Sequence, residues 1–163
     1  MRKPDYNRVL RLVDKLRKKY KLYSPPIDPV KIARHEGVEV KFVTFDDKHD
    51  NISGFYDSKT NTIYVNENES PKRQTFTVAH ELAHALLHRT WASTNDYRVM
   101  MRNNDASRLH DPYEKEANAF AANLLMPRDL LDKYYELDPV HLARIFSVSV
   151  PAIKTRLEFE YGI

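Results

Sequence analysis

The sequence of 163 residues contains no cysteine and only three glycines. Without cysteine, the chain can form no disulfide bond, no thiolate metal site and no cysteine nucleophile. Three glycines also exclude a collagen-like repeat. The longest unbroken apolar run is four residues, 119–122, whereas a membrane-spanning helix needs about 20. Any chemistry must therefore come from histidine, aspartate, glutamate, serine or tyrosine.

The composition is that of a folded globular protein. Hydrophobic residues make up 42% and charged residues 30% of the chain, with one tryptophan, ten tyrosines and seven phenylalanines. This length suits one domain, or one domain with a small appendage. The charged N-terminus has no apolar segment typical of a signal peptide, so we expect a cytoplasmic protein.

Positive charge is concentrated at the N-terminus. The net charge is +3, but residues 1–22 contain nine Lys/Arg against Asp5 and Asp14. Apolar residues recur there at helical spacing: Tyr6, Val9, Leu10, Val13, Leu16 and Tyr20. The pattern predicts a basic amphipathic helix over residues 1–22, docked through its apolar face with the basic face in water. Contact with nucleic acid or an anionic membrane is the alternative.

The remaining pattern predicts an α+β fold that is mainly helical. Capping residues before prolines predict helices from Pro29, Pro71 and Pro139, and prolines also start helices at 112 and 127. Alternating apolar residues predict strands over 38–42, 52–56 and 62–66, forming a small antiparallel sheet. A short strand over 97–101 and a polar loop over 102–111 complete the expectation. The edge at 62–66 is a candidate for binding an extended substrate as an added strand.

An HExxH motif lies at the centre of the predicted helix over 70–89. It consists of His80 and His84 with Glu81 beside the first histidine. Histidines four residues apart share one helix face, about 6 Å apart along the axis, so both can reach one metal ion. Satisfied histidines on a buried helix are the structural alternative, but burying them without partners is costly. We therefore expect a metal site in which Glu81 is the general base.

The third metal ligand must come from elsewhere in the chain. His88 would extend the row of histidines, but it lies about 12 Å from His80 along a helix. The metzincin pattern needs glycine at 87 and histidine at 90, where this chain has Leu87 and Thr90. We interpret His88 as a helix-end histidine favoured by the helix dipole.

Two glutamates about thirty residues further on are candidates for the third ligand. Glu114 shares a helix face with small residues suited to close packing, whereas Glu116 points elsewhere. We therefore predict Glu114 as the ligand, Glu116 as the fallback, and Asn118 as a hydrogen-bond partner of a ligand histidine. His110 in the preceding loop is expected to be solvated.

Three segments of the chain resemble the ImmA/IrrE metallopeptidase family. They are TVAHELAHALLH at 77–88, EKEANAFAANLLMP at 114–127 and LARIFSVSVPAIKTRL at 142–157. The resemblance covers most of residues 25–160. It implies a zincin-like metallopeptidase domain over 1–126 and a helix-turn-helix-like C-terminal subdomain over 127–163, packed on the first.

The resemblance also implies a function. Known members of the family are gluzincin-like zinc proteases that cleave DNA-binding repressors of mobile elements or stress regulons. The implied zinc ligands are His80, His84 and Glu114, although manganese and iron accept similar ligands. Asn118 stands where the wider gluzincin pattern often has aspartate, which orients a histidine more strongly. The expected partner is a helix-turn-helix repressor, with no role for a membrane.

Two other functions are compatible with the residues. The closing helices resemble a helix-turn-helix, but residues 138–163 hold three Lys/Arg and three Asp/Glu, a poor balance for phosphate binding. An anti-repressor that binds its partner without cleaving it is the second alternative. A purely structural metal site would not need Glu81, which favours proteolysis.

Overall fold

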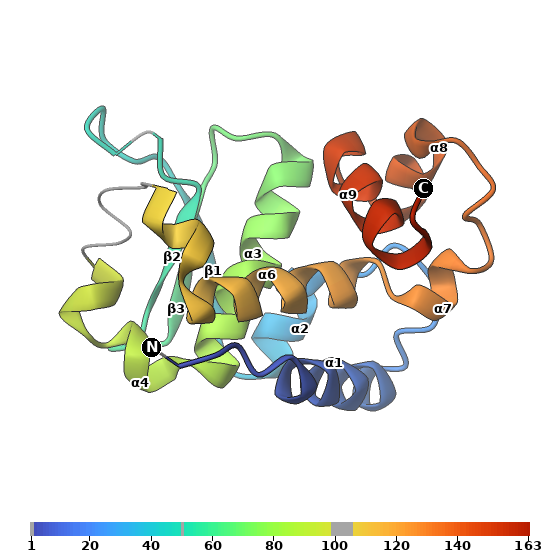
Figure 1. The fold of residues 1–163 in the computed structure, drawn as a ribbon. Helices are drawn as coiled ribbons and strands as arrows, with labels where there is room; N and C mark the ends of the chain where they lie inside the picture. Colours follow the sequence, from blue (N-terminus) through green and yellow to red (C-terminus); the bar gives the residue numbers. More distant parts are fainter. Residues whose placement is uncertain (1, 50, 99–105) are drawn as a thin grey trace.

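The computed structural model describes residues 2–49, 51–98 and 106–163 (Figure 1). The fold is α+β and mainly helical, as predicted, with a three-stranded sheet. In chain order the elements are α1 (Tyr6–Tyr20), α2 (Pro29–His35), β1 (Glu39–Val43), β2 (Gly54–Asp57), β3 (Thr62–Asn66), α3 (Pro71–Leu87), α4 (Arg89–Ala92), η1 (Ala106–His110), α6 (Pro112–Leu125), α7 (Arg128–Leu131), α8 (Pro139–Phe146) and α9 (Val150–Tyr161).

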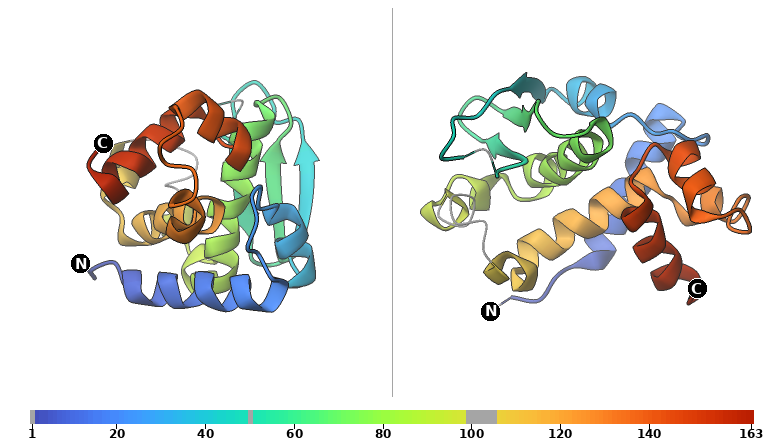
Figure 2. Two further views of the ribbon diagram at one scale, coloured as in Figure 1. Left: turned by 90° about the vertical axis from the view of Figure 1, so that its right-hand side faces the viewer. Right: turned by 90° about the horizontal axis from the view of Figure 1, so that it is seen from above.

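Helix α3 is the centre of the fold. It lies between the sheet and α6, and α1 packs along α6 (Figure 2). Leu82 and Ala83 of α3 and Ala117, Phe120 and Ala121 of α6 are fully buried. The small side chains allow the two helices to approach closely. The α3–α6 interface is therefore where side chains from the two sequence motifs meet.

Local capping fixes where these two helices begin. The Ser70 side chain accepts a hydrogen bond from the backbone N–H of Arg73, and Pro71 occupies the first turn. Asp111 accepts from the backbone N–H groups of Tyr113 and Glu114 at the start of α6. These caps satisfy N–H groups that a helix start leaves unpaired. They set the helical phase of the motif residues.

The sheet differs from the predicted antiparallel sheet because β1 pairs with β3 in parallel. The predicted hairpin of β2 and β3 is antiparallel, so the sheet is mixed, with the order β1-β3-β2. Ile63 of β3 consequently lies opposite Val40 on one side and Tyr56 on the other. The prediction that 62–66 forms an exposed edge was therefore wrong. Alternation of apolar residues predicts where strands lie, but it does not predict which strands pair or in which direction.

Other sequence predictions have mixed outcomes. The N-terminal helix docks through Val9, Val13 and Leu16, as expected. The predicted strand over 97–101 was wrong where it can be assessed, since residues 95–98 are helical and 99–101 lie outside the described residues. Part of the predicted loop is the short helix η1. Among the described helices, none has the length and apolar character needed to cross a membrane.

Helices α7 to α9 follow α6 directly. Arg156 of α9 is 4% exposed and donates hydrogen bonds to the Met126 carbonyl and the Asn123 side chain. It also forms an ion pair with Glu160 at 2.9 Å. A guanidinium held in this way fixes α9 against the end of α6 and does not face solvent.

Candidate metal centre

Helix α3 buries the HExxH residues at the α3–α6 interface. His80, Glu81 and His84 are 8%, 2% and 0% exposed. One potential ligand atom from each lies within 4.8 Å of those from the other two. A buried cluster of two histidines and a glutamate is therefore compatible with a metal ion.

Glu114 approaches the same two histidines from α6. Its Oε2 lies 2.8 Å from Nε2 of His80 and its Oε1 lies 3.4 Å from Nε2 of His84. Both Nε2 atoms are buried and, within the described part of the chain, neither has a partner with hydrogen-bond geometry. Ligand atoms about 2 Å from a tetrahedral zinc ion lie roughly 3.3 Å apart. The spacing and the two unbonded nitrogens fit a bound zinc ion.

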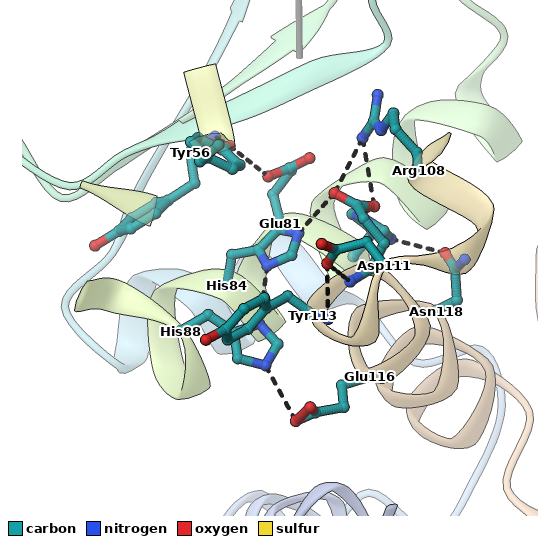
Figure 3. A network of polar contacts seen from close by, with 12 residues as sticks. Tyr56, Glu81, His84, His88, Arg108, Asp111, Tyr113, Glu116 and Asn118 are labelled. Carbon is teal, nitrogen blue, oxygen red and sulfur yellow. Dashed lines mark hydrogen bonds and ion pairs between the residues drawn. The ribbon is translucent and has the colours of Figure 1, made fainter. Parts of the chain in front are cut away.

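The two candidate glutamates have different surroundings. Glu114 also faces Arg108 of η1, with a guanidinium nitrogen 3.3 Å and 3.4 Å from its two oxygens. Glu116 is 0% exposed and pairs instead with His88 (Figure 3) and with Arg2. Glu114 is thus the carboxylate that the structure brings to the HExxH histidines, and Glu116 is not.

Charge pairing sets the protonation of the cluster. Burial alone would raise the pKa of Glu114, but the adjacent imidazole of His80 lowers the pKa well below its usual range. Conversely, although burial disfavours a charged imidazole, the carboxylate of Glu114 raises the pKa of His80. Glu114 is therefore an anionic carboxylate, the form in which it can bind a cation.

Glu81 is held by a hydrogen bond from Tyr97. The buried Tyr97 hydroxyl donates to Oε2 of Glu81 at 3.1 Å and accepts from the backbone N–H of Tyr56 at 2.7 Å. This N–H orients the hydroxyl, which leaves its proton for Glu81. Burial raises the pKa of the Glu81 carboxyl, and the nearby imidazoles of His84 and His80 oppose that shift. Glu81 is thus held in place with a pKa above that of an ordinary carboxyl.

The two histidines are held through their other nitrogens. Nδ1 of His80 lies 2.9 Å from the side-chain oxygen of Asn118, which was predicted to contact one of the two ligand histidines. Nδ1 of His84 lies 2.9 Å from Nδ1 of His88. Each imidazole thereby directs its Nε2 toward Glu114. Such partners fix the tautomer and orientation of a ligating histidine.

His88 ends α3, as predicted, but the sequence did not indicate that it is buried. His88 is 3% exposed, and its Nε2 lies 3.3 Å from Oε1 of Glu116. Burial lowers its pKa to about 2, so the imidazole is neutral. Helical spacing placed His88 beside His84, but the sequence could not indicate that α6 covers this face. His110, in contrast, is exposed at the end of η1, as expected.

A cleft of about 500 Å³ opens beside the cluster. Its walls include Ser53 and Gly54 of the sheet side, Arg73 of α3 and the exposed Leu109 of η1. A Cβ atom at Gly54 would lie 2.5 Å from the Tyr64 carbonyl oxygen and 2.7 Å from a Thr77 methyl group. Only glycine therefore allows β2 to pack this closely on α3.

Sequence reasoning missed two side chains that contact the cluster, Tyr97 and Arg108, and one that contacts Glu116, Arg2. Tyr97, Arg108 and Arg2 come from segments whose sequences have no recognisable spacing relative to the HExxH motif. Their hydrogen-bonding groups were visible, but ten tyrosines and 26 Lys/Arg offered too many candidates. Only the tertiary arrangement identifies them.

A mainly helical α+β fold with a buried histidine and glutamate cluster compatible with a metal ion is a type of structure found in metallopeptidases. The chain belongs to the IrrE N-terminal-like domain family, peptidase M78, which matches residues 33–158. This confirms the predicted ImmA/IrrE assignment. Residues 2–32, including α1, lie outside the match.

Two curated relatives match parts of the chain. The chain is 32% identical over 131 residues to the uncharacterized immunity region protein 2 of Bacillus phage phi105, covering 79% of this chain and 75% of that protein. It is 38% identical over 88 residues to the radiation response metalloprotease IrrE of Deinococcus deserti, covering 48% of this chain. The match spans only 27% of IrrE.

A solved structure supports the fold. A Mycobacterium tuberculosis transcriptional regulator superposes with a TM-score of 0.63 and 20% sequence identity. The match covers 94% of this chain and 49% of that chain. At this identity the likeness concerns the fold alone, and it extends over nearly the whole chain.

Proposed function

We propose that the protein is a zinc-dependent endopeptidase, with His80, His84 and Glu114 as metal ligands. The observation that carries the proposal is the pair of buried, unbonded Nε2 atoms that face the Glu114 carboxylate. Two histidines and one carboxylate leave one position of a tetrahedral zinc ion for water or substrate, which is typical of catalytic sites. Manganese and iron accept the same ligand types, so zinc is the proposed and not the exclusive ion.

Glu81 is the proposed general base. A bound zinc ion would supply a Lewis acid that acidifies water and polarises a peptide carbonyl. Glu81 would accept a proton from the attacking water and then transfer it to the leaving amine. The hydrogen bond from Tyr97 keeps one carboxylate oxygen fixed while the other remains able to take that proton.

The outer edge of β2 is the proposed binding site for an extended substrate segment, in place of the predicted 62–66. The N–H of Tyr56 bonds to Tyr97 and not to β3, so it points to the outer edge of the sheet. Main-chain groups of alternate residues in a strand point to the same side. The N–H and C=O of Gly54, two residues before Tyr56, therefore also point to the outer edge, where Gly54 lines the cleft. A peptide bound there as an added strand would pass beside Glu81.

We propose a helix-turn-helix repressor as the substrate, cut in the cytoplasm. The names of the relatives, a phage immunity region protein and a radiation response metalloprotease, support a regulatory substrate. Residues 1–126 would form the catalytic domain, and 127–163 a C-terminal subdomain that contributes to substrate docking. Direct DNA binding is disfavoured because Arg156, one of the few basic residues of the second closing helix, is buried in an ion pair.

The test is cleavage of candidate repressors from the same genome, followed by intact mass measurement. The wild-type chain should produce two fragments whose masses sum to the repressor plus one water. Glu81→Gln should bind zinc normally and produce none, since glutamine keeps the shape but cannot accept the proton. A chelator should stop wild-type cleavage and added zinc should restore it. An intact repressor that co-purifies with the wild-type chain would instead indicate a non-proteolytic anti-repressor.

A further inference from the structure

A buried chain of polar contacts leads from the proposed ligand His84 to the N-terminus. Nδ1 of His84 contacts Nδ1 of His88, and Nε2 of His88 contacts Glu116 (Figure 3). The second carboxylate oxygen of Glu116 pairs with the guanidinium of Arg2. The first three members are at most 3% exposed, and the Arg2 side chain is 37% exposed. The catalytic mechanism proposed above uses none of the last three residues.

Metal binding by His84 fixes the direction of each hydrogen bond in this series of contacts. A neutral histidine that binds metal through Nε2 carries its proton on Nδ1. His84 must then donate to His88, whose Nδ1 accepts. The proton of His88 is therefore on Nε2, from which it can be donated only to an acceptor such as the Glu116 carboxylate. The tautomer of His84 thus depends on the Glu116 carboxylate, which His84 reaches through His88.

Arg2 is held where this negative charge is buried. Its guanidinium lies 4.3 Å from the ring centre of Tyr113, a cation–π contact on α6. Asp5 caps α1 immediately after this segment, and Arg8 of α1 donates to the Leu87 carbonyl at the end of α3 at 3.2 Å. A carboxylate that is 0% exposed is costly to bury without a counter-charge or hydrogen-bond donors. Arg2 supplies that counter-charge from outside the residues 33–158 that the family match covers.

We propose that Arg2 and Glu116, acting through His88, are positioning residues that hold His84 in the tautomer and orientation required for metal binding. The N-terminal segment thereby becomes part of the support of the metal centre. The inference rests on the proposed ligands, but it does not depend on whether the bound metal performs proteolysis.

The test measures zinc dissociation constants by competition with a chromophoric chelator, using the full chain and its single variants. Loss of the partner of a ligating histidine usually weakens metal binding by about 10- to 100-fold. We expect that loss for His88→Phe, which retains a ring but no ring nitrogen. Glu116→Gln is nearly isosteric and should weaken zinc binding by about tenfold, and Arg2→Ala by about threefold.

Two further variants and a spectroscopic readout separate positioning from general stability. Arg2→Lys should restore most of the affinity because it keeps the charge, and Arg11→Ala, which removes an exposed charge from α1, should leave it unchanged. Cobalt-substituted Glu116→Gln should have an altered visible absorption band, since the His84 ligand field changes. Unfolding temperatures of the metal-free variants report stability independently.

Unchanged zinc affinity and an unchanged cobalt spectrum in both Glu116→Gln and Arg2→Ala would overturn the inference, even if the unfolding temperature falls. If His88→Phe does not fold, the nearly isosteric Glu116→Gln still allows zinc affinity and the cobalt spectrum to be measured. A wild-type chain that binds no zinc would overturn the proposed metal centre and this inference together. A chain that binds zinc with the expected variant pattern but cleaves no repressor would overturn only the proposed proteolysis.

Discussion

The two histidines of the HExxH motif lie one helical turn apart, yet their surroundings differ. His80 lies beside the cleft, and its Nδ1 contacts Asn118, an exposed neutral amide. His84 is 0% exposed, and its Nδ1 contacts His88, which is backed by the buried carboxylate of Glu116. The flank of the site at His80 is therefore open and supported by a single hydrogen bond. The flank at His84 is closed and supported by the buried series of contacts through His88 to Glu116.

This difference indicates a division of roles within one metal centre. An open flank allows substrate to reach the site, but an exposed amide constrains its histidine only weakly. On the closed flank His84, His88 and Glu116 are removed from water, so each contact among them is stronger and each lost partner costs more. The geometry of the site should therefore depend mainly on His84, and access to the site should depend mainly on the side of His80.

The largest effect should follow from removing either histidine, and the comparison predicts a difference between the two variants. Structural zinc binding contributes roughly 10–16 kcal/mol over four ligands, so loss of one ligand should weaken zinc binding by on the order of 100-fold or more. His84→Ala should also destabilise the metal-free protein, because it leaves buried His88 with an unpaired nitrogen. His80→Ala should destabilise it less, since water can replace the contact with Asn118.

Zinc titration and thermal unfolding without metal check this prediction. His35→Ala, at the end of α2, is a matched control that removes a histidine distant from the proposed ligands. Equal losses of metal-free stability in His80→Ala and His84→Ala would contradict the proposed difference between the flanks.

Tyr97→Phe should affect turnover without affecting metal binding. The variant removes only the hydroxyl that donates to Glu81. Loss of such an orienting partner should lower kcat by about 10- to 100-fold, while the zinc dissociation constant remains that of the wild type. Fragment formation over time and zinc competition measure the two quantities. Weaker zinc binding in Tyr97→Phe would show that Glu81 and its partner belong to the ligand set, contrary to the assigned role.

Asn118→Asp should make the open flank resemble the closed one. A carboxylate at this position would pair with Nδ1–H of His80 and raise the basicity of the imidazole, tightening zinc binding by about tenfold. Asn118→Ala should weaken it by a similar factor. If both substitutions leave zinc affinity unchanged, the contact between His80 and Asn118 has no positioning role. Because Asn118 is exposed, both variants should fold as the wild type does.

The sequence predicted the elements of the site better than their surroundings. Short-range rules were sufficient for α3 and α6, because Ser70 and Asp111 cap these helices and helical periodicity selects Glu114 over Glu116. The ImmA/IrrE resemblance added the link between the two helices. The same reasoning predicted that Asn118 contacts a ligand histidine, and the structure identifies it as His80.

What the sequence did not predict depends on contacts between distant segments. β1 pairs with β3 in parallel. The alternation of apolar residues does not show how the connection between two strands runs, so it could not predict this pairing. Arg2 and His88 were both visible as residues, but their connection through Glu116 exists only once α1 packs along α6. Local patterns therefore identified the proposed ligands, and tertiary packing identified the groups that hold them.

The smallest effect should come from an ion pair at the other end of α1. Arg17 pairs with Asp129 of α7 at 2.7 Å, but the aspartate side chain is 60% exposed. Exposed pairs typically contribute about 0.5 kcal/mol, so a double-mutant cycle of Arg17→Gln and Asp129→Asn, followed by chemical denaturation, should give a coupling of that size. Zinc affinity should not change in any of the three variants. A weakening like that expected for Arg2→Ala would mean that docking of α1 as a whole, and not the buried charge on Glu116, supports His84.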